Sequence, residues 1–384
     1  MIRICHIATS DIALRFLTFN QLRHFKSEGY EVTVVCSPGN WTSDIEKAGI
    51  KVKTIPMARS ITPLKDVVSF WKLYKFINKE KFDIVHTYTP KAGLLGSWAA
   101  KFAGVPIIIH SNLGLYFHEH SSRLRKLVFG WVERLSVLSA DIIFSVDRED
   151  IEIARQKHIG KPDAWRYLGG WVDLERFNPD KFSSTFKNKK KKELRIDEYK
   201  KVIGIAARLV AEKGYLELFD AFKKVLEKHP NTTLLVIGPE ENKKDAVNPS
   251  VAKKYDIQNY VKFLGVRTDM PELYSVMDVF TLPSHREGIG ISILEASAMG
   301  LPSVSTNVRG CREAVDDGKT GILVPHKNSE KLAEALLWVL EHPEEAKQMG
   351  KAGRAKVERE FDEKLVFERL DREYKRLIEE KLKK

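Results

Sequence analysis

Cysteine, glycine and proline are all scarce in this 384-residue chain. The three cysteines, Cys5, Cys36 and Cys311, lie far apart and form no Cys-x-x-Cys pair, so a disulfide scaffold is not predicted and a reducing compartment fits best. With 23 glycines and 15 prolines, collagen-like and disordered chains are excluded. No run approaches 18 apolar residues, and the N-terminal region shows no apolar stretch of signal-peptide length. We therefore expect an ordinary globular protein of the cytoplasm.

Acidic residues are fewer than basic ones in this sequence. The chain has 64 Lys and Arg against 52 Asp and Glu, which gives a net charge of +12 and predicts an anionic partner: nucleic acid, anionic lipid or a phosphorylated substrate. Both halves of the sequence share the excess, so no basic tail or single basic domain is indicated.

Short apolar runs alternate with helical patterns along the whole chain. The predicted strands cover 2–7, 31–36, 51–56, 83–88, 106–110 and 141–146, then 202–206, 233–237, 261–264, 279–282, 303–305 and 321–324. Helical segments such as 14–27 and 63–78 separate most of them. This rhythm predicts an α/β protein with two Rossmann-like, doubly wound domains.

A change in composition separates the two halves. Residues 181–200 are rich in Ser and Lys, and the run Lys189–Lys192 favours a solvated linker. We expect an N-terminal domain over 1–180 and a C-terminal domain over 201–361. The last helix, about 362–384, is expected to pack back on the N-terminal domain.

The most informative stretch is LPSHREGIGISILEASAMGLPSVSTNVRGCREAV, residues 282–315. After a predicted strand, a loop and the start of a helix carry, in order, Glu287, Gly288, Gly290 and Ile291. Ligands in open parallel sheets bind beyond the carboxyl ends of the strands, and glycines at a helix start let a phosphate approach the backbone amides. One turn into the helix, Glu295 could accept hydrogen bonds from both hydroxyls of a ribose. Alternatively, both glutamates are ordinary loop or helix carboxylates.

Two cations follow the first predicted strand of the second domain. Arg208 and Lys213 could together meet the diphosphate of a substrate, although ordinary surface cations would look the same in sequence. The chain contains no Asp-x-Asp, HExxH or His-x3-His pattern. We therefore expect no metal and no cofactor, with charge neutralisation left to these side chains and to backbone dipoles.

Several blocks of the sequence resemble glycosyltransferase family 4. The spacing Glu287-x7-Glu295 is similar to the family's Glu-x7-Glu motif, and RLVAEKG, from Arg208 to Gly214, is similar to its GRL-x3-KG segment. Residues 86–100 and 107–122 resemble blocks of members that build cell-surface polysaccharides, so the likeness extends across nearly the whole chain. The resemblance implies the GT-B fold, two Rossmann-like domains facing each other across a cleft, and a retaining, metal-independent reaction.

The resemblance also assigns roles to residues of the C-terminal domain. It implies that Glu295 holds the donor ribose, that Glu287 lies near the donor sugar, and that Arg208 and Lys213 stabilise the leaving nucleotide diphosphate. The turn that receives the phosphates would consist of Gly288, Gly290 and Ile291. Val266 and Arg267 would border the base, unless Arg267 is merely solvated. A G-x-R-E element of the family is matched by Arg309, Gly310, Arg312 and Glu313. We interpret this element mainly as part of the loop structure and only secondarily as a ligand contact.

The N-terminal domain departs from the family pattern in two places. Leu113-Gly114 stands where the family commonly has His-Gly, and Gly170-Trp171 stands where it has Asn-Gly. The family's sugar-contacting histidine therefore has no counterpart at 113. His118, as a catalytic candidate, and Glu119, as a substrate-binding one, are the polar candidates in the same loop, although such a histidine is often structural. Because of these departures, the activity of this chain could be reduced or altered relative to the family.

One segment of this domain predicts a basic amphipathic helix. In SSRLRKLVFGWVERLSVL, residues 121–138, one face collects Leu124, Leu127, Val128, Trp131 and Leu135, beside Arg123, Arg125, Lys126 and Arg134. Such a helix could rest on an anionic membrane surface, which would suit a lipid-linked acceptor. The favoured interpretation is that the apolar stripe packs against the sheet.

These patterns together predict transfer of a sugar from a nucleotide-sugar donor to a saccharide or lipid-linked acceptor in cell-surface glycan synthesis. UDP is the expected nucleotide, with GDP as the alternative, and the enzyme would be cytoplasmic or peripheral on the inner face of the membrane. One rival is a GT-B-like UDP-sugar 2-epimerase, which needs no acceptor. The other is a non-enzymatic nucleic-acid binder; because the basic residues are dispersed, no nucleic-acid partner is expected.

Overall fold

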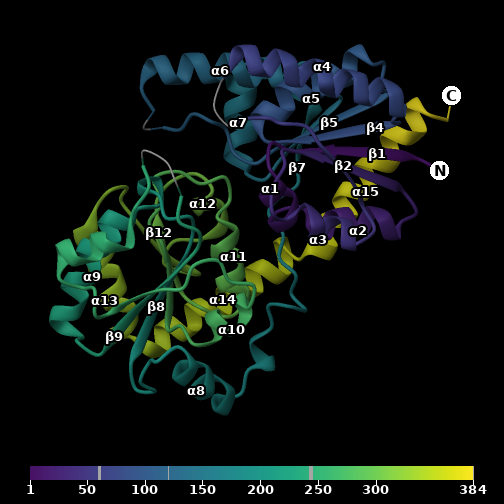
Figure 1. Ribbon diagram of the computed structural model, residues 1–384. Helices are drawn as coiled ribbons and strands as arrows, with labels where there is room; N and C mark the ends of the chain where they lie inside the picture. Colours follow the sequence, from purple (N-terminus) through teal and green to yellow (C-terminus); the bar gives the residue numbers. More distant parts are fainter. Residues whose placement is uncertain (59–61, 120, 242–244, 384) are drawn as a thin grey trace. The chain divides into compact units, whose positions relative to one another are not determined.

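The computed structural model describes residues 1–58, 62–119, 121–241 and 245–383, apart from the side chain of Arg125. His120, in one of the family-like blocks, lies outside the described residues. The chain forms two compact units: unit 1 is Met1–Leu168 with Phe367–Lys384, and unit 2 is Gly169–Val366. Each unit holds one parallel sheet with helices on both faces (Figure 1). The predicted α/β architecture with two doubly wound domains is confirmed.

Unit 1 contains seven parallel strands. They are β1 (Arg3–Ile7), β2 (Glu31–Cys36), β3 (Lys51–Thr54), β4 (Ile84–Tyr88), β5 (Ile107–Asn112), β6 (Ile142–Ser145) and β7 (Trp165–Tyr167). The helices are α1 (Asp11–Phe16), α2 (Phe19–Ser27), α3 (Thr42–Lys47), α4 (Pro63–Glu80), α5 (Pro90–Phe102), α6 (Arg123–Val137) and α7 (Arg148–Gln156), joined by the end of α15 (Glu363–Lys381). The strand order is β3-β2-β1-β4-β5-β6-β7.

One face of this sheet is covered by α4 and α5. Cys5 and Ile7 of β1 and Val85 of β4 pack in one cluster with Leu73 of α4 and Ala99 of α5. The intervening strand residues point to the other face, because side chains alternate along a strand. Helix α5 contacts both α4 and α6, so it lies between them.

The opposite face of the sheet carries a buried polar network that binds α15. The ring of His86 lies 2.6 Å from the Tyr374 hydroxyl of α15 and 2.7 Å from the Ser111 hydroxyl, while His6 lies 2.9 Å from the Tyr88 hydroxyl. Burial lowers the pKa of His6 to about 3 and holds the pKa of His86 well below its usual value, so both rings are neutral. The hydrogen bond between His86 and Tyr374 fixes the C-terminal helix in unit 1.

Unit 2 contains a six-stranded parallel sheet. Its strands are β8 (Lys201–Ala206), β9 (Thr232–Ile237), β10 (Val261–Phe263), β11 (Val279–Leu282), β12 (Ser303–Thr306) and β13 (Gly321–Val324), in the order β10-β9-β8-β11-β12-β13. The helices are α8 (Ser184–Glu193), α9 (Tyr215–Lys228), α10 (Met270–Ser275), α11 (Ile291–Ala298), α12 (Cys311–Ala314), α13 (Ser329–Glu341) and α14 (Pro343–Glu360), with short 3₁₀ turns that include η3 (Ala211–Lys213).

Two sequence-based expectations about the connecting region differ from the structure. The division between the units falls at Leu168, not near residue 180, and 181–200 contains helix α8. The Lys189–Lys192 run is not wholly solvated, because Lys190 is 5% exposed and its ammonium group meets carboxylates of α8 and α10. A buried lysine is found where partners compensate its charge, and sequence alone did not reveal those partners.

Candidate active site

The sheet of unit 2 changes direction between β8 and β11. From β8 the chain adds β9 and β10 on one side, and from β11 it adds β12 and β13 on the other. At such a switch point the loops beyond the carboxyl ends of neighbouring strands separate and leave a crevice that receives ligands. The loop after β8 carries Arg208 and Lys213, and the loop after β11 carries Glu287 and Gly288. The fold therefore brings these two sequence-predicted segments to one edge.

Charged side chains hold the two loops together. Lys213 forms an ion pair with Glu287, whose carboxylate also accepts a 2.6 Å hydrogen bond from Ser284. Beside it, Arg286 contacts Glu212 at 2.7 Å, and the backbone amide of His285 donates to the Glu212 carbonyl. The direct contact between Lys213 and Glu287, like the further ties between the two loops, was not predicted from the sequence.

Gly214 lets these loops approach. Its φ of 74° lies in the left-handed region, and a Cβ built on it would lie 2.0 Å from the carbonyl oxygen of Pro283. A side chain at this position would clash with the backbone after β11, so only glycine fits. The glycine of the segment that resembles GRL-x3-KG is therefore explained by packing.

Arg208 lies on the same side of the sheet but contacts a different carboxylate. Its guanidinium is 3.3 Å from Glu241, and its side chain is more than one-third exposed. Burial raises the pKa of Glu212, but Arg286, Lys213 and Arg208 outweigh it and hold that pKa below the usual value. Arg208 and Lys213 therefore contribute positive potential to one place, although no direct contact joins Arg208 to Glu287.

Glu295 has a different environment from Glu287. Its carboxylate accepts a 2.9 Å hydrogen bond from the buried hydroxyl of Tyr274 on α10. Burial raises the pKa of Glu295 to about 7, although the Tyr274 hydrogen bond and the charge of Arg176 act in the opposite direction. Within the motif, Glu287 is thus an ion-paired carboxylate, whereas the pKa of Glu295 lies near neutrality.

The start of α11 is shaped by two glycines. Gly290 precedes the helix with φ 59°, and Ile291 is the first helical residue. A Cβ on Gly310 would lie 2.7 Å from the carbonyl carbon of Gly288, so the loop after β12 packs directly on the turn. The first amides of a helix lack intrahelical acceptors and favour anions. Gly288 thus lies in a tightly packed turn, and Gly290 and Ile291 supply amides of this kind at the start of α11.

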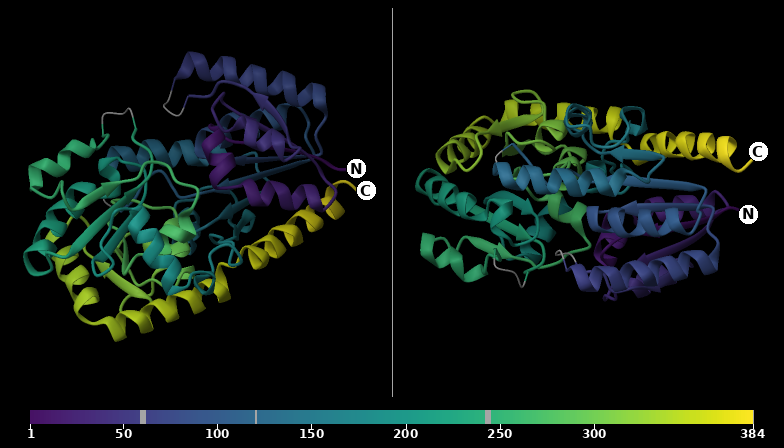
Figure 2. Two further views of the ribbon diagram at one scale, coloured as in Figure 1. Left: turned by 60° about the horizontal axis from the view of Figure 1, so that its bottom comes forward. Right: turned by 90° about the horizontal axis from the view of Figure 1, so that it is seen from above.

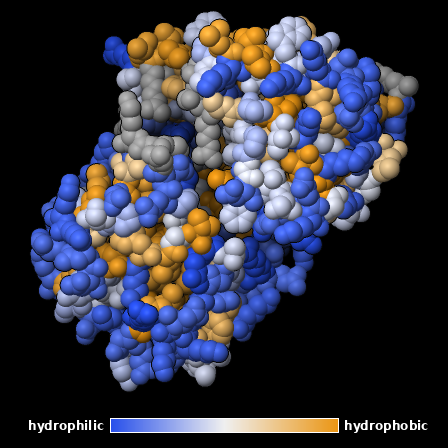
Figure 3. Space-filling view, viewed as in Figure 1, coloured by the Kyte–Doolittle hydropathy of each residue, from blue (hydrophilic) through white to orange (hydrophobic). Residues whose placement is uncertain are grey.

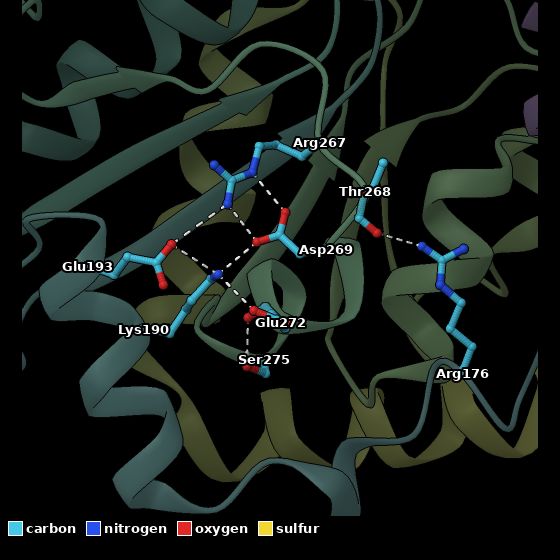
Figure 4. A network of polar contacts seen from close by, with 8 residues as sticks. All are labelled: Arg176, Lys190, Glu193, Arg267, Thr268, Asp269, Glu272 and Ser275. Carbon is cyan, nitrogen blue, oxygen red and sulfur yellow. Dashed lines mark hydrogen bonds and ion pairs between the residues drawn. The ribbon is translucent and has the colours of Figure 1, made fainter. Parts of the chain in front are cut away.

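The segment after β10 is fixed by a polar network (Figure 4). Arg267 contacts both oxygens of Asp269, at 2.8 and 2.6 Å, and Lys190 of α8 reaches Asp269 and Glu272 at 2.7 Å each. Arg176 donates to the carbonyl of Thr268 at 2.8 Å. The sequence-predicted Arg267 is therefore paired within the protein and not simply solvated, whereas Val266 is exposed.

The candidates of the N-terminal half lie in unit 1. The amide of His118 donates to the Ser121 hydroxyl at 3.0 Å, and the carbonyl of Glu119 accepts from Lys126 at 2.8 Å. Both belong to the turn before α6. His110, in contrast, is fully buried and lies 2.9 Å from the Thr87 hydroxyl.

Two residues that act on Glu295 were not predicted from the sequence: Tyr274, which donates a hydrogen bond to it, and Arg176, whose charge lowers its pKa. Tyr274 sits at an apolar helical position in PELYSVMDVF and looks like a core aromatic in the sequence. Arg176 lies 119 residues before Glu295 in the chain. No local pattern connects either residue to Glu295, so only the fold could reveal them.

Solved structures share the architecture of this chain. The Anabaena protein Alr3699/HepE, solved in complex with UDP and glucose, superposes with a TM-score of 0.82 at 19% identity, over 98% of this chain and 100% of that one. A sucrose-phosphate synthase from Thermosynechococcus elongatus matches with a TM-score of 0.81 at 19% identity, over 98% and 99% of the two chains. The fold is that of the GT-B glycosyltransferases.

Sequence comparisons identify the family. The model described as "Glycosyl transferases group 1" matches residues 186–356, and the "Glycosyl transferase 4-like domain" matches residues 18–171. The capsular polysaccharide biosynthesis glycosyltransferase CapM of Staphylococcus aureus is 28% identical over 98% of both chains. The UDP-Gal:alpha-D-GlcNAc-diphosphoundecaprenol alpha-1,3-galactosyltransferase of Escherichia coli is 28% identical over 88% of both. The chain belongs to the family 4 type of glycosyltransferases, and the predicted resemblance is confirmed.

No helix in the described part of the chain is both long and apolar enough to cross a membrane.

Proposed function

We propose that this glycosyltransferase moves a sugar from a UDP-sugar to a hydroxyl of a lipid-linked saccharide, with retention of the anomeric configuration, in the synthesis of a cell-surface glycan. The observation that carries the proposal is the meeting of Lys213 and Glu287 at the switch point of unit 2, beside the glycine turn before α11. The names of relatives support it, since one uses UDP-Gal and a diphosphoundecaprenol acceptor.

In this proposal the donor diphosphate lies against the turn of Gly288, Gly290 and Ile291, where Lys213 and Arg208 neutralise its charge. Charge grows on the diphosphate as the sugar leaves, so fixed cations stabilise the transition state more than the ground state. Glu295 accepts from the ribose hydroxyls, and Val266 and Arg267 border the base. Glu287 lies near the donor sugar.

The proposed chemistry is a displacement on one face of the sugar. The departing diphosphate accepts the proton of the acceptor hydroxyl while the acceptor oxygen forms the new glycosidic bond. Glu287 is paired with Lys213 and hydrogen-bonded to Ser284, which suits a positioned carboxylate and not a free nucleophile. No covalent glycosyl-enzyme is proposed.

The acceptor is proposed to bind unit 1, where His118 is the catalytic candidate and Glu119 the substrate-binding one. A lipid-linked acceptor places the enzyme at the cytoplasmic face of the membrane. The N,N'-diacetylbacillosaminyl-diphospho-undecaprenol alpha-1,3-N-acetylgalactosaminyltransferase of Campylobacter jejuni, 26% identical over 93% of this chain, supports a lipid-linked acceptor.

The test is turnover by the purified full-length chain. UDP- and GDP-sugars are first screened by thermal shift, and each stabilising donor is then incubated with and without diphosphoundecaprenol-linked sugars in detergent. We expect nucleotide release and a longer lipid-linked product only when both substrates are present. A UDP-sugar converted to its epimer without any acceptor would instead establish the epimerase, and no stabilisation by any nucleotide sugar would refute the donor site.

Donor affinity is expected to rise with pH through about 7. Glu295 accepts from the ribose hydroxyls best when ionised, and its pKa of about 7 means that ionisation is completed only above neutrality. The dissociation constant of a UDP-sugar, measured by calorimetry, should fall roughly tenfold between about pH 6 and about pH 8. A sugar nucleotide is the right probe because its diphosphate does not titrate in this range.

The matched control is Glu295→Gln, which keeps the shape and removes the titration. Its affinity should be weak and independent of pH over the same range. Tyr274→Phe removes the hydroxyl that donates to Glu295, so its pH dependence should move to higher pH. If wild type and Glu295→Gln show the same pH profile, Glu295 does not hold the ribose.

A further inference from the structure

Helix α4 exposes an apolar row that the sequence patterns did not single out. Leu64 is 86% exposed and Trp71 is 53% exposed, and Val67 and Val68 lie between them on the same face. The spacing of i, i+3, i+4 and i+7 places all four on one side of the helix. The opposite side, with Leu73 and its neighbours, packs on the sheet. Large apolar side chains in a contiguous exposed row mark an interaction surface.

Helix α6 exposes a second row. The side chains predicted to pack against the sheet are exposed instead, so that interpretation was wrong: Leu124 is 70% exposed and Trp131 is 55% exposed. The other exposed members of this row are Leu127, Val128, Leu135 and Leu138. The residues that face inward are polar as well as apolar, since Glu133 and Ser136 are buried. The amphipathic stripe therefore points away from the core of unit 1.

The two rows belong to one face of unit 1. Helix α5 contacts both α4 and α6, and the three helices run alongside one another (Figure 2, right). Between the rows, Phe102 at the end of α5 is exposed too. In Figure 3, hydrophobic side chains gather along the upper edge, over α4 and α6. We call this surface, made of the exposed side chains of α4 and α6 together with Phe102, the apolar face.

The exposed charged side chains described on α4 and α6 are all basic. On α4 the exposed charged residues are Lys65, Lys72, Lys75 and Lys79, and on α6 Arg123 is exposed. None of the exposed residues described on these two helices is acidic, because Asp66, Glu80 and Glu133 are partly or fully buried. Asp66 is moreover neutralised by Lys91 of α5 at 2.7 Å. Apolar side chains flanked by lysine match the interface of a bilayer that carries anionic lipids.

We propose that the apolar face docks unit 1 on an anionic phospholipid bilayer, with the side chains of α4 and α6 entering the interface and the flanking lysines meeting lipid phosphates. Tryptophan and leucine supply apolar insertion, and the lysines supply long-range attraction. This inference deepens the proposed use of a lipid-linked acceptor, because it names the surface and the partner that would deliver that acceptor. It does not depend on the chemistry of transfer.

The test is flotation of the full-length protein with vesicles. Mixed phosphatidylcholine and phosphatidylglycerol vesicles should carry the wild type upward at low salt, while pure phosphatidylcholine vesicles should carry much less of it, and added salt should reduce binding. The double variants Leu64→Ser/Trp71→Ser on α4 and Leu127→Ser/Trp131→Ser on α6 should each lower partitioning by about tenfold or more. Lys72→Glu/Lys75→Glu should lower it selectively for anionic vesicles.

The matched control is Tyr199→Ser/Leu216→Ser, which removes exposed apolar side chains from unit 2 and should bind vesicles as the wild type does. Unchanged melting temperatures check that each variant folds. Turnover with a detergent-solubilised acceptor should be preserved in the surface variants, so loss of vesicle binding and failure of the proposed transfer are separate results. Absence of wild-type binding to anionic vesicles, equal binding to both vesicle types, or full binding by the α4 variant would overturn the proposal. So would a dimer seen by light scattering that these substitutions dissociate while no vesicle binding occurs.

Discussion

Lys213→Ala is expected to lower kcat by about 10²-fold or more, with a smaller change in KM for the donor. The ammonium group lies at the switch point of unit 2 and is held by Glu287, so it is fixed before any substrate arrives. A preorganised cation facing charge that develops in the transition state contributes about 3 kcal/mol to catalysis, similar to an oxyanion-hole donor. Arg208→Ala should show a loss of the same kind.

Steady-state kinetics and thermal melting together check this prediction. Lys213→Ala leaves Glu287 without its cation, so a lower melting temperature alone would show only a structural tie. The proposed role requires that kcat fall at temperatures where the variant is fully folded, and that Lys213→Arg recover part of the activity. Lys223→Ala is the matched control, because Lys223 forms an exposed ion pair with Asp256 and should have wild-type kinetics. Wild-type kcat in both Lys213→Ala and Arg208→Ala would refute the assignment.

Lys190→Met is expected to lower the free energy of unfolding by about 3 kcal/mol. The side chain of Lys190 is 5% exposed, and its ammonium group meets Asp269, Glu272 and Glu193, which would face one another without it (Figure 4). Removing one partner of a buried ionic cluster costs about 3–5 kcal/mol, because the remaining charges stay uncompensated. We expect the lower limit of this range, because Asp269 remains paired with Arg267 and the carboxylates of Glu193 and Glu272 are partly exposed to solvent.

Urea denaturation of the wild type and of Lys189→Met provides the comparison. Lys189 is an exposed neighbour in the same lysine run, so its variant should be as stable as the wild type. Hydrogen bonds from Arg267 hold the pKa of Asp269 well below its usual value, against the effect of burial, and Lys190 adds to the shift. A depressed carboxyl pKa gives stability that is present above the unfolded value of about 4 and is lost as the pH falls further. Equal stability of the Lys190→Met and Lys189→Met variants would contradict the role given to the cluster.

The same cluster connects the segment after β10 to α8. If Arg267 borders the donor base as proposed, then Lys190 acts on donor binding only through Asp269. Lys190→Met should then raise donor KM while the kcat at saturation stays close to that of the wild type.

Much of the architecture could be predicted because parallel strands carry strong local signals. Runs such as Glu31–Cys36, Val279–Leu282 and Gly321–Val324 match strands of the structure at both ends. Strand β7 was missed, since its three residues WRY form no apolar run. The predicted helix over 14–27 is two helices, with the hydroxyl of Thr18 bonded to the Leu14 carbonyl at the break.

Local sequence patterns were enough to predict the α/β class, the two sheets, the glycine-rich turn and the types of residue around it, because these depend on periodicity and on residues close together in the chain. The partners of those residues, in contrast, depend on the folded arrangement of the chain. Lys213 meets Glu287 and Tyr274 meets Glu295 because neighbouring strands and helices bring distant segments together. Likewise, the direction of the α6 stripe and the burial of Lys190 depend on which neighbours cover each helix, and no amphipathic pattern contains that information.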